Sequence, residues 1–122
     1  KKQNNMATLT PTLTLTSSDI SSDTLSLTTT DSLTVSGDIV GVSRVPLSTG
    51  DLTLLAAASY TKSYVYLKNT DTSIAMDVDF GSTLSIQLAG GEFCFFPWES
   101  SQNIVVKAAS GTPVLEYAAF EA

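Results

Sequence analysis

The sequence predicts an all-β protein, an antiparallel β-sandwich with a jelly-roll-like arrangement and an extended Thr/Ser-rich N-terminal segment. Short runs of residues alternate between apolar and polar side chains, which is the period of a strand with one buried face. Clusters rich in Gly, Ser, Asn and Asp separate these runs at short intervals, as in sandwiches and jelly rolls. No stretch has the length and the period of a helix that joins two parallel strands.

Residues 1–38 form a first region, which we predict to be an arm or a set of additional strands. Thr12–Asp19 recurs twelve residues later as Thr24–Asp31, and a shorter copy follows at Ser32–Asp38. Each copy alternates hydroxyl and aliphatic residues before a polar turn, so about two or three strands are expected. These strands pair either inside the sandwich or with a neighbouring molecule.

Residues 39–122 form a second region, which we predict to be the packed body because it holds every Phe, Tyr and Trp of the chain. The first expected strand, 39–45, precedes a proline and a turn at 48–51. Residues 52–57 are ambiguous, because Leu-Leu-Ala-Ala-Ala also suits a helical turn. The run is short, and we predict a strand.

The central strands of the body alternate most clearly. Strand 64–68 places its valine and leucine opposite its two tyrosines and its lysine. Residues 69–73 are predicted to be a hairpin loop leading to strand 74–80, whose Ile, Met, Val and Phe point into the core. Strand 84–88 follows. Its predicted core residues are Leu84, Ile86 and Leu88.

The last three strands complete about eight in the body, after a tight turn at Gly90–Gly91 where positive φ is expected. In strand 92–96 both faces are apolar, as in a strand that covers its own core and also meets a partner. Pro97-Trp98 is expected to end this strand, because proline cannot continue a ladder. Strands 104–108 and 114–120 close the body.

Composition excludes several classes of function. The formal charge is −6 and the six Lys and Arg residues are scattered, so no basic stripe can neutralise nucleic-acid phosphates. The chain has no histidine, the commonest general base and metal ligand. One cysteine cannot form an intrachain disulfide. We therefore expect no nucleic-acid partner and no metal.

The sequence also gives no sign of a membrane segment. No apolar run approaches the roughly 18 residues of a membrane span, so we expect no membrane partner. No apolar stretch of signal-peptide type follows Lys1-Lys2. Met6-Ala7-Thr8 is typical of a natural start, with residues 1–5 either an added remnant or part of a longer start.

Acidic pairs and the cysteine are the candidate reactive groups. Asp77 and Asp79 share a strand face, which would suit calcium or a glycosidase pair, but we expect a solvated face that discourages edge pairing. Glu92 and Glu99 flank the aromatic strand without a second base or metal ligand. Cys94 is expected to be a buried thiol of raised pKa. We predict no catalytic residue, no cofactor and no enzyme.

Aromatic side chains are the candidates for a binding surface. Tyrosines and a tryptophan on a sandwich would suit stacking on sugar rings, but such side chains also pack in a core or in a contact between subunits. We favour a subunit interface, with Tyr60 a further aromatic of the same region. The predicted interface residues are Phe93, Phe95, Phe96, Trp98, Tyr64 and Tyr66.

Three segments and the opening run Met6–Leu15 give the chain a family resemblance. The segments are Tyr64–Asp71 (Tyr-Val-Tyr-Leu-Lys-Asn-Thr-Asp), Gly91–Trp98 (Gly-Glu-Phe-Cys-Phe-Phe-Pro-Trp) and Val114–Phe120 (Val-Leu-Glu-Tyr-Ala-Ala-Phe). On these residues, and over nearly the whole chain from Met6, the sequence resembles the small virion structural proteins of tailed phages. The likeness is strongest for phages of aquatic and cyanobacterial hosts.

The resemblance implies a particle component that is not an enzyme, with no catalytic residues to carry over. The leading role it implies is a capsid decoration or cement protein, made in the host cytoplasm and bound to the capsid surface of the virion. Its implied partners are the major capsid protein and itself, as a homotrimer. The alternatives are a tail, neck or fibre-associated component and, from another class, a carbohydrate-binding module.

Overall fold

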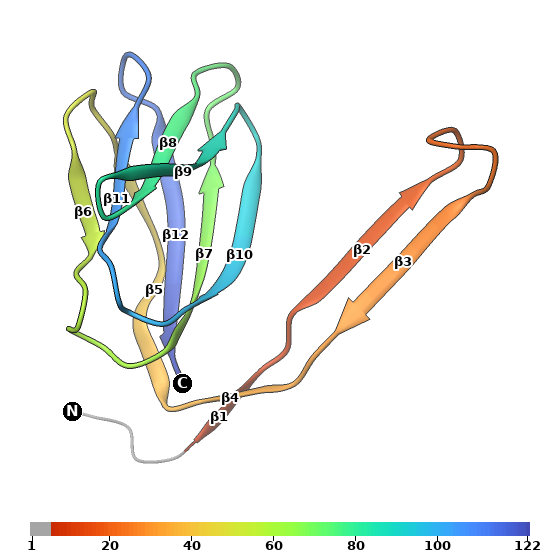
Figure 1. Ribbon diagram of the computed structural model, residues 1–122, viewed down its shortest axis with the longest axis horizontal. Coiled ribbons are helices and arrows are strands. Elements are labelled where there is room, and N and C mark those ends of the chain that lie inside the picture. Colours follow the sequence, from red (N-terminus) through yellow and green to blue (C-terminus); the bar gives the residue numbers. More distant parts are fainter. Residues whose placement is uncertain (1–5) are drawn as a thin grey trace. The chain divides into compact units, whose positions relative to one another are not determined.

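The computed structural model describes residues 6–122, which contain twelve strands and no helix (Figure 1). They belong to two units, the first ending at Ser36 and the second running from Gly37 to Ala122. The division lies two residues before the predicted boundary at 38/39. Every strand pairs within its own unit, so the N-terminal strands are part of neither sheet of the body.

The first unit is a β-hairpin in two parts. Its ladders join β1 (Ala7–Leu9) to β4 (Leu33–Val35) and β2 (Thr12–Ser17) to β3 (Leu25–Thr30), all antiparallel. Between the ladders, the Asp31 amide donates to the Pro11 carbonyl over 3.2 Å. Proline has no N–H to give to a ladder, which accounts for four short strands where two or three were expected. The twelve-residue repeat supplies the two arms of the hairpin.

The second unit is a sandwich of two four-stranded antiparallel sheets, which confirms the predicted fold class. Its strands are β5 (Gly37–Pro46), β6 (Leu52–Leu55), β7 (Ser63–Asn69), β8 (Met76–Phe80), β9 (Thr83–Leu88), β10 (Phe93–Trp98), β11 (Ile104–Ala108) and β12 (Val114–Glu121). The β12 sheet has the order β10-β7-β12-β5, and the β11 sheet has the order β6-β11-β8-β9. Only β8 and β9 are consecutive strands of one sheet. The other connections cross between the sheets, as in a jelly roll.

One core lies between the two sheets, and alternation along the strands fills it. In β7, Val65 and Leu67 are buried while Tyr64, Tyr66 and Lys68 point outward, as predicted. The buried members of the core are Leu47, Leu55, Val65, Leu67, Met76, Val78, Leu88, Trp98, Ile104, Val106, Ala108, Leu115 and Ala119. Each sheet therefore keeps one face toward solvent.

Residues 69–73 join β7 to β8 across the two sheets, so the prediction of a hairpin loop is wrong. Asn69 is fully buried at the start of this crossing. Its Nδ2 donates to the carbonyls of Ile74 and Leu88, over 2.7 and 3.0 Å, and its Oδ1 accepts from the Asp71 amide over 2.9 Å. The amide side chain therefore supplies the bonds that a tight hairpin would have made between strands.

Two further residues fix the same crossing. The Asp71 carboxylate accepts the amides of Ile74 and Ser73, over 2.7 and 2.9 Å, and these bonds lower its pKa. Gly90 approaches the crossing so closely that a Cβ there would lie 2.5 Å from the carbonyl of Thr72. A side chain at that position would have to move the backbone.

A bulge corrects the predicted orientation of Leu84. Val78 pairs with Ile86 but Asp79 pairs with Leu84, so β9 carries one extra residue, Ser85, at this point. Leu84 consequently lies on the outer side of the β11 sheet with 56% of its surface exposed. Leu88 is buried and Ile86 packs against the core, as predicted.

Several strand bounds also differ from expectation, and β8 begins at Met76, two residues after its predicted start. β10 continues through Pro97 to Trp98, since it is an edge strand and a missing N–H is tolerated there. β6 stops at Leu55, before the predicted end at residue 57. A turn follows, in which Ala58 has a φ of 63°.

Candidate interaction surfaces

The outer side of the β12 sheet carries a row of aromatic side chains, here called the aromatic face. Its members lie on three neighbouring strands, where Phe95 pairs with Tyr66, Phe120 with Tyr64 and Phe93 with Lys68. They are Tyr64, Tyr66, Phe93, Phe95 and Phe120. Phe93 is 62% exposed and Phe95 is 40% exposed. The rings of Tyr64 and Phe95 are nearly parallel, with centroids 6.3 Å apart. Large apolar rings in this setting are typical of a contact surface.

Two of the six predicted interface residues do not reach this face. Phe96 points inward, where its ring meets Phe80 edge-on with centroids 5.6 Å apart. Trp98 is 5% exposed and its Nε1 donates to the Gln102 carbonyl over 3.0 Å. The structure brings Phe93, Phe95, Tyr64 and Tyr66 together and places these two in the body. Trp98 has no free ring face for a sugar.

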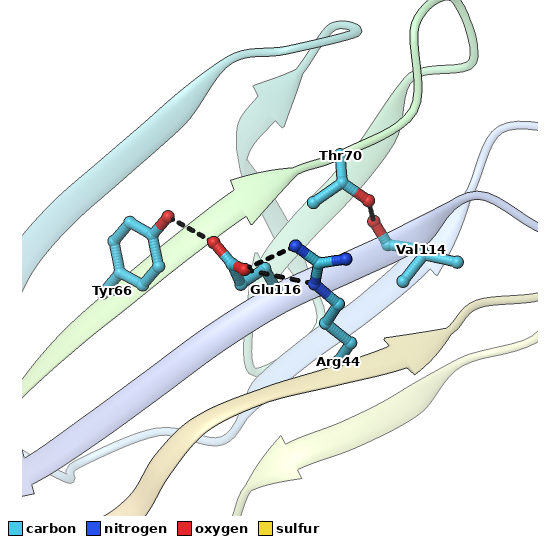
Figure 2. A network of polar contacts seen from close by, with 5 residues as sticks. All are labelled: Arg44, Tyr66, Thr70, Val114 and Glu116. Atoms are coloured by element: carbon cyan, nitrogen blue, oxygen red, sulfur yellow. Dashed lines mark hydrogen bonds and ion pairs between the residues drawn. The ribbon is translucent and has the colours of Figure 1, made fainter.

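A charged network borders the aromatic face on β12 (Figure 2). Glu116 accepts a hydrogen bond from Tyr66 Oη over 2.8 Å on one side. On the other side, Arg44 Nη2 and Nε lie 3.1 and 3.2 Å from its Oε2. Just after β7, Thr70 donates its hydroxyl to the carbonyl of Val114 over 2.7 Å, which links this end of β7 to the start of β12. The network fixes Tyr66 in its outward orientation.

These contacts set the protonation of the two groups. The Tyr66 hydroxyl and then the Arg44 guanidinium favour the charged carboxylate, so the pKa of Glu116 lies below its ordinary value. Burial, followed by the hydrogen bond to the carboxylate, raises the pKa of the Tyr66 phenol. Glu116 is thus a fixed anion and Tyr66 a fixed donor. Neither is suited to act as a proton shuttle at neutral pH.

Cations gather around the aromatic face. Lys68 lies in the same cross-strand row as Phe93, Glu116 and Arg44. Lys62 Nζ lies 5.6 Å from the ring centroid of Tyr64. Arg44, Lys62 and Lys68 are, with Lys107, all the cationic side chains of residues 6–122. An open hollow of about 450 Å³ adjoins the charged row, lined by its side chains and by the turns at 69–72 and 90–91.

The hairpin has two chemically different faces. Leu15 pairs with Leu27, Leu13 with Thr29 and Leu25 with Ser17, so Leu13, Leu15, Leu25 and Leu27 share one side, here called the leucine face. The opposite side, the hydroxyl face, consists of Thr12, Thr14, Thr16, Ser26, Thr28 and Thr30. Leu13, Leu15 and Leu27 are each 44–47% exposed. The leucine face therefore lacks a covering layer.

The predicted acidic pairs serve the strands and turns. Asp77 accepts from Gln87 Nε2 over 3.0 Å and lies opposite Lys107. Asp79 has one carboxylate oxygen buried without a hydrogen-bond partner among the described residues. Glu92 Oε1 accepts the Ala89 amide over 2.7 Å and closes the turn before β10. The face of Asp77 and Asp79 is therefore partly shielded and not simply solvated.

The remaining candidates have structural explanations. Glu99 accepts from the Ser101 hydroxyl over 3.2 Å in the turn after β10. Burial raises the pKa of the Cys94 thiol to about 11, as its place between two phenylalanines predicted. Within residues 6–122, no three His, Cys, Asp or Glu side chains come together to hold a metal ion. The same residues contain no helix long and apolar enough to cross a membrane.

Sequence reasoning missed three parts of these surfaces. Arg44 and Glu116 are far apart in the chain, and only strand pairing brings them together. Phe120 joins the aromatic face from the last strand. The leucine face was visible as alternation, but alternation does not show whether such a face is covered. No family model matches this sequence, and no curated protein matches it.

Proposed function

We propose that this chain is a structural protein of a tailed-phage virion, a decoration protein that binds the outer surface of the major capsid shell and stabilises the particle. The segments at 64–71, 91–98 and 114–120 support this role through their resemblance to small virion structural proteins. The described surfaces support it through their chemistry, since they offer aromatic, aliphatic and hydroxyl contacts and no assembled reactive group.

The leucine face of the hairpin is the observation that carries the proposal. A two-stranded hairpin is marginal in water unless its apolar side packs on something. Three of these leucines keep nearly half their surface exposed. The hairpin is about a quarter of the chain, and contact with another molecule would stabilise it by covering its apolar side. Particle components are built in this way, because their folding is completed by their neighbours.

Bridging is the mechanism that follows from two contact surfaces in two units. A decoration protein that touches several subunits at once needs no strong single contact, because each further contact forms at high effective concentration. The hairpin reaches one neighbour while the body holds another. Subunits linked in this way separate only when several contacts break together, which resists heat and internal pressure.

Copy number per particle tests the proposal most directly. A decoration protein occurs at a level comparable with that of the major capsid protein, by quantified gel or particle reconstruction. A small fraction of that level would instead assign the chain to the tail, neck or fibres. Absence from purified particles would overturn the virion role altogether.

Stability of the particle tests the stabilising role. Particles that lack this protein are expected to release their DNA at lower temperature and after milder osmotic shock than complete particles. Adding the purified chain back should restore resistance. Unchanged resistance would leave a virion component that does not cement the shell.

Carbohydrate binding is the alternative from a different class, and the exposed rings of the aromatic face beside a polar hollow favour it. Phe93, with 62% of its surface exposed, is the ring most available to a sugar. A glycan array that gives a signal lost on Phe93→Ala would support this alternative. No signal with the intact chain would remove it.

A further inference from the structure

We propose that the leucine face of one molecule docks on the aromatic face of a second molecule, so that copies of this chain join head to tail. The two surfaces are defined above, and each is apolar and exposed in the single chain. The inference concerns contacts between copies of the chain. It stands or falls separately from the virion role.

The hairpin requires a cover on one side only. Its hydroxyl face holds threonines and one serine, which remain hydrated without cost, and Thr12 and Thr30 bond each other through their hydroxyls over 3.1 Å. Its leucine face gains about 25 cal/mol for each Å² removed from water. A sheet that buries this face against a second sheet reproduces the packing of an ordinary sandwich.

The aromatic face has matching dimensions. Alternate residues on a strand stand about 7 Å apart on one side. Leu13 and Leu15 have this spacing on the hairpin, as do Tyr64 and Tyr66 on the body. Two hairpin strands therefore fit over the three strands that carry the aromatic rings, with leucines seated between rings. Exposed aromatic side chains and an apolar centre are typical of protein–protein interfaces.

Charge favours a second copy in this orientation as the occupant. Residues 6–36 contain three aspartates, Asp19, Asp23 and Asp31, and no cation. Around the aromatic face lie Arg44, Lys62 and Lys68. Arg44–Glu116 is the one ion pair within residues 6–122. Lys68 acts on Glu116 without forming an ion pair and Lys62 lies over the Tyr64 ring, so both ammonium groups can still meet an incoming carboxylate.

Like surfaces would repel where unlike surfaces attract. Two aromatic faces placed together would oppose three cations with the same three cations, offset only in part by Glu116 and Asp38, and two hairpins placed together would oppose aspartates with aspartates. When the hairpin docks on the aromatic face, its aspartates approach the cations of the second copy and the two apolar surfaces come into contact. Such a contact uses different patches on the two molecules, and it closes into a ring when the rotation between copies allows it.

Light scattering on the purified full chain gives the first test. The intact chain is expected to elute at a multiple of its 12.8 kDa mass. L15S/L27S should shift it to the single-chain mass, while the matched control T14S/T28S on the hydroxyl face should not. F93S/F95S should also give the single-chain mass, and L52S/L84S on the other sheet should not. An intact chain that is monomeric at every concentration would overturn the proposal.

Mixing the two defective variants separates this contact from other modes of association. L15S/L27S keeps a good aromatic face and F93S/F95S keeps a good hairpin, so an equal mixture should form a species of two chains joined by one contact. Far-ultraviolet circular dichroism should confirm that both variants keep their strands, since their substituted side chains point outward, and the near-ultraviolet spectrum should confirm the packing of the body. A mixture that stays at the single-chain mass would refute head-to-tail docking.

The outcome is independent of the virion test. Chains that are monomeric in solution but abundant on particles would overturn head-to-tail docking and leave the proposed function intact. Chains that associate as predicted but are absent from particles would do the reverse. High salt adds a check, because about 0.5 M NaCl should weaken a contact that pairs aspartates with lysines.

Discussion

Asn69 shows how one buried polar side chain sets the path of this chain. Its amide makes three hydrogen bonds at the point where the chain leaves the β12 sheet for the β11 sheet. We expect Asn69→Ala to lower the free energy of unfolding by about 3 kcal/mol, because buried carbonyls then lack a donor. Urea unfolding followed by circular dichroism measures the change.

Thr70→Val is the matched control for that substitution. Its hydroxyl donates to the Val114 carbonyl, but the Thr70 amide donates to the same oxygen over 3.1 Å and would remain. The expected loss is therefore under about 1 kcal/mol. Equal losses in the two variants would contradict the role assigned to Asn69.

Glu116 and Tyr66 predict a pH dependence. Tyr66→Phe removes the main cause of the lowered pKa of Glu116, so the pKa of that carboxyl should rise, as followed by ¹³C NMR. A carboxyl with a lowered folded pKa stabilises the fold above its unfolded value of about 4.3 and loses that contribution as pH falls through the folded pKa. The stability gap between the intact chain and Tyr66→Phe should therefore shrink in acid. Tyr64→Phe, which does not bond Glu116, should leave the titration unchanged.

At the scale of single elements, β10 is an edge strand with a proline near its end. Its sequence from Phe93 to Phe96 is apolar on both sides, and Pro97 follows within the same strand. An exposed apolar edge pairs readily with other chains, and proline opposes this by withholding an N–H. We expect Pro97→Thr to aggregate faster on gentle heating, as light scattering would record. A variant no more prone to aggregate would mean that the edge is protected by other means.

Alternation in the sequence predicted where the strands lie, but it could not predict which strands pair with one another. The period of β7 gave its buried residues correctly, and that of β8 gave Met76 and Val78, but the predicted core residue Ile74 lies before the start of β8 and outside the core. Alternation could not show that residues 69–73 cross between sheets, because a loop of polar residues suits either path. It misplaced Leu84, because the extra residue Ser85 gives Leu84 the opposite orientation to Ile86 and Leu88, which follow it. It could not divide Phe93 from Phe96, since all four residues of that run are apolar.

At the scale of the whole molecule, the two units predict separate folding. Each pairs its own strands, and β5 begins at Gly37 opposite Glu121. We expect a chain of residues 37–122 to keep the β-sheet circular dichroism and the cooperative unfolding of the body. It should also lose self-association, because the leucine face is gone. An unfolded truncated chain would mean that the first unit is required for the fold of the body.

The neighbours β5 and β12 have a consequence for the time at which the body folds. They are the first and last strands of the body, yet β12 lies between β5 and β7 in one sheet (Figure 1). While the chain is being synthesised, the place of the central strand stays empty until residue 121 leaves the ribosome. Pairings so distant in sequence form slowly, and the partly made chain exposes two unpaired edges meanwhile. The body is therefore expected to complete its fold only after residues 114–121 have been synthesised, and its unpaired edges can bind other chains until then.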